Sequence, residues 1–235
     1  MVITKNLANH LEETEIKMFK SRFNAIKEIK NNAMGVEIGQ FEGAYAFFIK
    51  NIPGPSYNVV KGDSLSSENT IDKILSFYKT REIPARFDLA PQYVNTTSLQ
   101  KLHNAGLFQS DFHATLYCEL NEETVGKTKN SFIKIRQINE DEFDRYGNIY
   151  VEGFGMPAFL ADSVTANNKV LYDKPGWSFY IATLQGEDVG IGSLYINDRT
   201  AILAASAVKP KARNQGVHQA LTQFRIKKLF NKIVV

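Results

Sequence analysis

Cysteine is almost absent from this 235-residue chain, whose single Cys118 cannot form an internal disulfide. Because a free cysteine usually behaves as a small apolar residue in the protein interior, we expect Cys118 to be buried. The cysteine and histidine clusters that mark zinc sites are also missing, so we expect no metal. Long apolar runs are absent too, and the charged N-terminus is unlike an export signal. These absences favour a cytoplasmic protein without a membrane span.

Excess charge of either sign is small as well. The 28 Lys and Arg residues nearly balance 25 Asp and Glu residues, for a formal net charge of +3. This surplus is too small to indicate nucleic acid or a membrane surface as partner. The basic stretch RIKKLFNK, residues 225–232, lacks the aromatic residues and spacing of nucleic-acid binders, so we interpret it as a solvated helix face. Apolar residues make up 43% of the chain, enough for a sizeable core.

The first half of the chain mixes helical and strand patterns. Apolar residues spaced by three and four positions predict a helix over 11–29. A hairpin with a turn centred on Gly39 follows, then a third strand and a helix capped by Ser66 or Ser67. The alternating stretch FHATLYCEL, residues 112–120, predicts another strand.

The second half begins after a polar segment without periodicity, residues 121–130, which predicts a linker. We therefore place one domain at 1–121 and another at 131–235. The second domain is predicted to contain a strand, a helix capped by Asn139 or Asp141, a second helix, three antiparallel strands and a final helix. The predicted fold class is mixed α+β.

The segment VKPKARNQGVHQAL joins the last of these strands to the final helix. Pro210 cannot donate a hydrogen bond to a sheet, so the strand ends near Val208. The first turn of the helix then exposes several unpaired N–H groups, which attract anions. Gly216 leaves room for a phosphate beside them, and Arg213 adds a permanent positive charge. The segment therefore indicates a diphosphate site.

The residues Arg213 to His218, placed after AASAVKP, resemble the Arg/Gln-x-x-Gly-x-Gly/Ala signature of the GCN5-related N-acetyltransferase (GNAT) superfamily. The order of elements over 132–230 is also similar to that family. The resemblance implies an acyl-CoA N-acyltransferase fold, a mostly antiparallel sheet flanked by helices, with acetyl-CoA as cosubstrate.

The resemblance also implies a set of site residues. The end of the last strand would offer backbone groups to the pantetheine arm, and the signature loop would hold the pyrophosphate. His218 departs from the family pattern, which has Gly or Ala at that position, and we interpret it as a solvated residue at the helix start. The implied cofactor-binding residues are Ala207, Val208, Arg213, Asn214, Gln215, Gly216, Val217 and His218.

The activity that the resemblance implies is transfer of an acetyl group to a primary amine of a small molecule or peptide. No catalytic group can be assigned: the carboxylates of Glu152, Glu187 and Asp188 are of the right type, but helix-end and turn carboxylates are usually solvated. Trp177 and Tyr195 are interpreted as packing residues. The alternative is a non-catalytic acyl-CoA-binding or regulatory protein, or an inactive fragment.

Residues 1–121 loosely resemble the same fold but lack the diphosphate signature, so we interpret them as a degenerate GNAT-like domain. The sequence also ends soon after the final helix, where family members continue, so we expect the second domain to lack its final elements. An unfinished sheet leaves an unpaired edge. We therefore expect either a homodimer that completes the sheet or coverage by the first domain.

Overall fold

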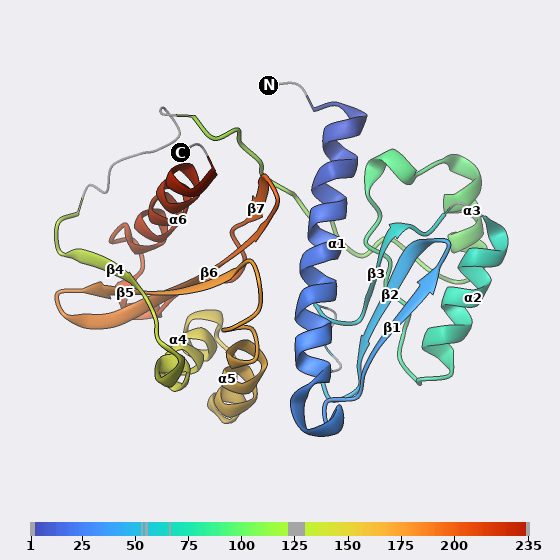
Figure 1. The fold of residues 1–235 in the computed structure, drawn as a ribbon. Coiled ribbons are helices and arrows are strands. Elements are labelled where there is room, and N and C mark those ends of the chain that lie inside the picture. Colours follow the sequence, from blue (N-terminus) through green and yellow to red (C-terminus); the bar gives the residue numbers. More distant parts are fainter. Residues whose placement is uncertain (1–2, 53, 55, 66, 122–129, 234–235) are drawn as a thin grey trace. The chain divides into compact units, whose positions relative to one another are not determined.

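A computed structural model describes the chain except for residues 1–2, 53, 55, 66, 122–129 and 234–235 (Figure 1). The chain divides into two compact units, Met1–Ala114 and Thr115–Val235. Most of the predicted linker, residues 121–130, lies outside the described residues. No helix in the described part of the chain has the length and apolar character needed to cross a bilayer.

The first unit is a three-stranded antiparallel sheet, in the order β1-β2-β3, with helices on both faces (Figure 1). Short 3-10 turns lie at Ile29–Asn31 and Pro91–Tyr93. On one face the Phe23 ring of the first helix lies 4.9 Å from the ring of Phe47. The elements in chain order are α1 (Lys5–Lys27), β1 (Val36–Phe41), β2 (Gly43–Ile49), β3 (Val59–Asp63), α2 (Glu68–Lys79) and α3 (Thr96–Asn104).

Most predicted elements of this unit are confirmed. Helix α1 covers the predicted apolar stripe, and the side chain of Ser67 caps α2 by accepting a hydrogen bond from the N–H of Thr70. The other cap candidate, Ser66, lies outside the described residues. The hairpin turn is not centred on Gly39, which lies within β1; the chain turns at Glu42, whose φ is 51°.

The strand predicted over 112–120 is wrong. These residues form neither helix nor strand, and Phe112 and Leu116 are 88% and 94% exposed. The alternating pattern supplies an apolar face, but a strand also needs a neighbour to accept its backbone hydrogen bonds. No strand pairs with this segment among the described residues. Cys118 is consequently exposed, in contrast to the predicted burial.

The second unit contains an antiparallel sheet in the order β4-β5-β6-β7, with β8 also paired to β6. Helices α4 and α5 lie on one face and α6 on the other (Figure 1). Short 3-10 turns lie at Glu140–Glu142, Ala158–Leu160 and Pro210–Ala212. The elements in chain order are β4 (Ile133–Gln137), α4 (Phe143–Phe154), α5 (Ala161–Lys169), β5 (Trp177–Leu184), β6 (Glu187–Asn197), β7 (Thr200–Ile202), β8 (Ser206–Val208) and α6 (Val217–Ile233).

The order of these elements is the one that the resemblance implied. Of the two predicted cap residues, Asn139 precedes the 3-10 turn Glu140–Glu142 that leads into α4, and its N–H donates to the Glu142 carboxylate at 3.0 Å. The residue that directly precedes α4 is Glu142, which neither candidate anticipated. The packing interpretation of Trp177 is also confirmed, since its ring lies 5.0 Å from the ring of Tyr195 and both side chains are buried.

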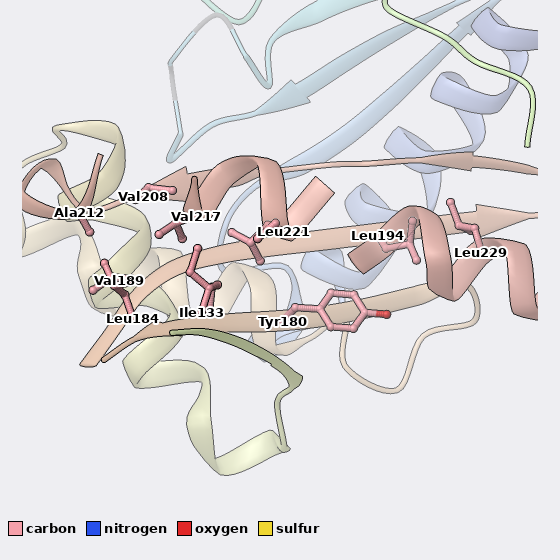
Figure 2. Close-up of a cluster of buried hydrophobic side chains, with 12 residues drawn as sticks. Ile133, Tyr180, Leu184, Val189, Leu194, Val208, Ala212, Val217, Leu221 and Leu229 are labelled. Atoms are coloured by element: carbon pink, nitrogen blue, oxygen red, sulfur yellow. The ribbon is translucent and has the colours of Figure 1, made fainter. Parts of the chain in front are cut away.

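One buried cluster of this unit lies between the sheet and α6 (Figure 2). Alternate residues of each strand point to this face, which is why Tyr180, Ala182 and Leu184 of β5 belong to it. Val217 and Leu221 from α6 pack against them. This packing fixes the beginning of α6 against the ends of β4, β6 and β8. The loop between β8 and α6 is therefore anchored at both ends.

Candidate functional site

The last predicted strand is broken into β7 and β8. The break lies at residues 203–205, where the N–H of Ser193 donates to two carbonyl oxygens, those of Ala204 at 3.1 Å and Ala205 at 2.9 Å. Ala205 has a φ of 28°, outside the range of regular strands. Two residues opposing one across a ladder define a bulge, which bends the strand and redirects the residues after it. The direction of β8 is therefore set by this bulge.

Ala207 and Val208, the two residues predicted at the end of β8, direct their backbone groups to opposite edges of the strand. The N–H of Lys209 donates to the carbonyl oxygen of Val189 on β6 at 2.8 Å. Because backbone groups alternate along a strand, those of Val208 point to the opposite edge. Among the described residues, β8 pairs only with β6, opposite Ile191 at Ala207. The N–H of Val208 thus faces the edge away from β6, whereas Ala207 pairs with β6.

The loop after β8 is shaped by two residues with positive φ. Asn214 has a φ of 61° and Gly216 a φ of 84°, a region that favours asparagine and glycine. A Cβ at Gly216 would meet only the Cδ1 of Ile133, at 4.0 Å, so the space beside it is open. In the described part of the chain, the N–H groups of residues 214–219 have no hydrogen-bond acceptor. The loop therefore exposes a row of donors at the start of α6.

Gln215 and His218 have different surroundings in this loop. The side-chain amide of Gln215 donates to the backbone carbonyl oxygen of Lys211 at 3.3 Å, and the backbone carbonyl oxygen of Gln215 accepts from the side-chain amide of Asn130 at 3.3 Å. The first bond lies within the loop, and the second ties the loop to the segment before β4. Val217 is buried in the core, while His218 is exposed in the first turn of α6.

Arg213 connects three parts of the unit. Its Nη2 donates to the carbonyl oxygen of Gly153 at 2.9 Å, and its Nε donates to that of Val208 at 3.3 Å. Helix α4 approaches β8 closely here, because a Cβ added at Gly153 would lie 2.7 Å from the Cβ of Ala207. The guanidinium thus ties the end of α4 to the end of β8, with its charge beside the loop.

The carboxylates considered as bases each lie beside a cation. Glu152 lies 3.5 Å from the Nζ of Lys209, and Glu187 pairs with Lys211. The hydrogen bond from Lys211 lowers the pKa of Glu187, which weakens it as a base.

Asp188 lies 3.1 Å from Nη1 of Arg145. Together with the two glutamates, it completes a set of three acid–cation pairs. Each of the three carboxylates is thus already engaged by a cation.

One residue of this region was missed by the sequence analysis. Arg225, interpreted there as part of a solvated basic face, is only 1% exposed, and burial lowers the pKa of its guanidinium to about 10. Its position could have been found from helical spacing, since it lies four residues after Leu221 and four before Leu229, both in the core. The rest of the basic stretch keeps its interpretation where it is described, because Lys227 and Lys228 are exposed.

No protein-family model matches the sequence, and no curated protein does so. A solved protein of Staphylococcus epidermidis, described as functionally unknown, shares the fold over 86% of this chain and 82% of its own, with 12% identity and a TM-score of 0.56. The ribosomal-protein-S18-alanine N-acetyltransferase of Escherichia coli is 17% identical over 43% of this chain, with a TM-score of 0.36. The match spans 61% of that enzyme.

An aminoglycoside acetyltransferase from a soil metagenomic sample, solved with sisomicin, is 16% identical over 43% of this chain and 72% of its own, with a TM-score of 0.35. A putative acetyltransferase of the GNAT family from Desulfovibrio desulfuricans is 19% identical over 43% of this chain, with a TM-score of 0.36. At these identities the likeness concerns the fold, a mixed α+β arrangement of antiparallel sheets flanked by helices.

Proposed function

We propose that this protein binds acetyl-CoA and transfers its acetyl group to a primary amine. The observation that carries the proposal is the row of N–H groups of residues 214–219, at the start of a helix whose preceding strand has an open edge. Within the described residues these N–H groups have no acceptor, and that edge has no partner strand. A helix start with free amides suits a diphosphate, and an open strand edge suits an extended amide-bearing arm. Coenzyme A carries both groups in one molecule.

Each residue of the proposed site has a distinct part. The amides from Asn214 to His218 would donate to the diphosphate, with Gly216 leaving the space open. Val208 would bond the pantetheine arm through its backbone N–H, since its carbonyl oxygen accepts from Arg213, and Ala207 would hold β8 in the sheet. Arg213 would fix the loop through its two carbonyl acceptors and add positive charge beside it.

The proposed reaction is direct attack of the neutral amine on the thioester. The amine nitrogen forms a bond to the acetyl carbon, the carbon–sulfur bond breaks, and coenzyme A leaves as a thiol that takes up the proton lost by the amine. Water is the group to which the ammonium would first lose its proton, since Glu152, Glu187 and Asp188 are held by cations.

The pairing of these carboxylates also favours a second candidate, an acyl-CoA-binding protein that does not turn over. Such a protein would need the strand edge and the amide row but no base. The two candidates share the binding site and differ only in chemistry. Binding is therefore the first property to measure.

The test is isothermal titration of the chain with acetyl-CoA. Wild type should bind, and Gly216→Glu should abolish binding, because its carboxylate occupies the diphosphate space and its φ of 84° is unfavourable for a side chain. Asn231→Glu is the matched control: it adds the same charge near the other end of α6, where it should leave binding unchanged.

The outcomes separate the alternatives. Failure of folded wild type to bind would refute both candidates. Binding that Gly216→Glu leaves intact would place the diphosphate elsewhere. Where binding agrees with the proposal, thiol release with a panel of primary amines distinguishes the transferase from the binding protein.

A further inference from the structure

Arg225 is a buried cation in the middle of α6. Its guanidinium donates four hydrogen bonds, all to neutral acceptors: Nε to the carbonyl oxygen of Leu221 at 3.1 Å, Nη1 to those of Ser193 at 2.8 Å and Ala204 at 3.1 Å, and Nη2 to Oγ of Ser206 at 3.2 Å. Burying a charge is costly unless its donors are satisfied. The four hydrogen bonds offset the free-energy cost of burying the guanidinium, and an apolar side chain at this position could not make them.

The acceptors of Arg225 indicate its role. Ser193 is the residue of β6 opposite the bulge, Ala204 lies within the bulge, and Ser206 is the first residue of β8. The guanidinium therefore contacts both sides of the strand break. Because a planar fork fixes its acceptors in direction as well as distance, it holds the bulge in one geometry.

The sheet is built to let this side chain reach the bulge. A Cβ at Gly192 would lie 3.1 Å from Cζ of Arg225, closer than ordinary packing allows. Glycine on β6 thus provides the space that the guanidinium fills. The arrangement uses glycine on the strand and arginine on the helix together, which a simple apolar contact would not require.

We propose that Arg225 is a positioning residue for the proposed acyl-CoA site, acting by fixing the bulge and hence the direction in which β8 presents Val208. The inference rests on the proposed function. It assigns to the middle of α6 the control of the pantetheine edge, whereas the start of the same helix supplies the diphosphate amides. The two parts of the ligand are therefore governed by different residues of one helix.

The test compares two ligands. Acetyl-CoA engages both parts of the site, whereas ADP carries a diphosphate without a pantetheine arm. Arg225→Met should weaken acetyl-CoA binding by about tenfold or more, the value of roughly one charge-assisted hydrogen bond, with little effect on ADP. Arg225→Lys should fail to restore it, because an ammonium lacks the planar fork. Lys227→Met, at an exposed position on the same helix, should change neither affinity.

The ratio of the two affinities is the readout, since general loss of structure would lower both. Equal weakening of acetyl-CoA and ADP, or none, in a folded variant would overturn the positioning role. If Arg225→Met does not fold, Ser206→Ala removes one acceptor with little change of volume, and it should shift the ratio in the same direction by a smaller factor; an unchanged ratio would overturn the inference. Wild type that binds neither ligand would instead refute the proposed function itself.

Discussion

The close approach of α4 to β8 predicts the effect of one methyl group. In Gly153→Ala the new Cβ would lie 2.7 Å from the Cβ of Ala207 and 3.2 Å from the backbone nitrogen of Val208. Ordinary carbon contacts lie near about 3.5–4.0 Å, so α4 and β8 must separate by several tenths of an ångström. The separation would also disturb the hydrogen bond from Arg213 to the carbonyl oxygen of Gly153.

Two terms of opposite sign decide the magnitude. Overpacking in a tight interface costs about 1–3 kcal/mol. Alanine is better than glycine within a helix by about 0.5–1 kcal/mol, which offsets part of that cost. We therefore expect Gly153→Ala to lower the free energy of unfolding of the second unit by about 1–2 kcal/mol.

The assay is urea unfolding followed by the fluorescence of Trp177. It is the only tryptophan of the chain and is buried in β5, so its emission reports on the second unit. Removing the opposing methyl group by Ala207→Gly should relieve the clash. The double variant should then be more stable than the sum of the single changes allows, by about 1 kcal/mol.

Additive effects of Gly153→Ala and Ala207→Gly would refute the reasoning. They would mean that the two positions do not compete for the same space, and that any loss in Gly153→Ala has another origin. Weaker acetyl-CoA binding by Gly153→Ala, restored in the double variant, would extend the same coupling to the proposed site.

Two further predictions concern charged groups. Lys61 is 2% exposed, and its Nζ lies 2.5 Å from Asp88 and 3.1 Å from Glu15. Because both carboxylates lose this partner but stay partly exposed to water, Lys61→Met should lower the free energy of unfolding, measured by circular dichroism, by about 1–3 kcal/mol; no measurable loss would contradict this. The Glu142 carboxylate has its pKa lowered to about 2 by hydrogen bonds from Arg136, so its contribution is complete above its ordinary pKa and is lost as pH falls toward 2. Because water screens the exposed Arg136, Glu142→Gln should cost at most about 1 kcal/mol at pH 7 and nothing near pH 2, and a cost independent of pH would exclude the ion pair as its source.

The sequence correctly predicted those helices whose formation depends on residues a few positions apart. Helix α1 follows from its apolar stripe, and the start of α2 from the cap residue Ser67, because both depend on neighbours within a few positions. The segment 112–120 shows the limit of this reasoning. Its alternation fits a strand, but pairing depends on a partner far along the chain, which the pattern does not specify.

The candidate site divides in the same way. Proline, glycine and the start of α6 were visible in the sequence, and they locate the loop. The bulge was not, because Ala205 adopts a φ of 28° without glycine or asparagine to indicate it. Nor was the burial of Arg225, since a cation within a basic stretch is usually solvated. Both features arise from contacts between β6, β8 and α6 that only the folded sheet creates.

The exposed segment 109–118 affects how this protein can vary. It contributes no backbone pairing among the described residues, and the boundary between the compact units, after Ala114, falls within it. Insertions or deletions there shift no strand register and open no core. Each unit has its own sheet and its own buried cluster. The length of this connection can therefore vary without a change in either sheet.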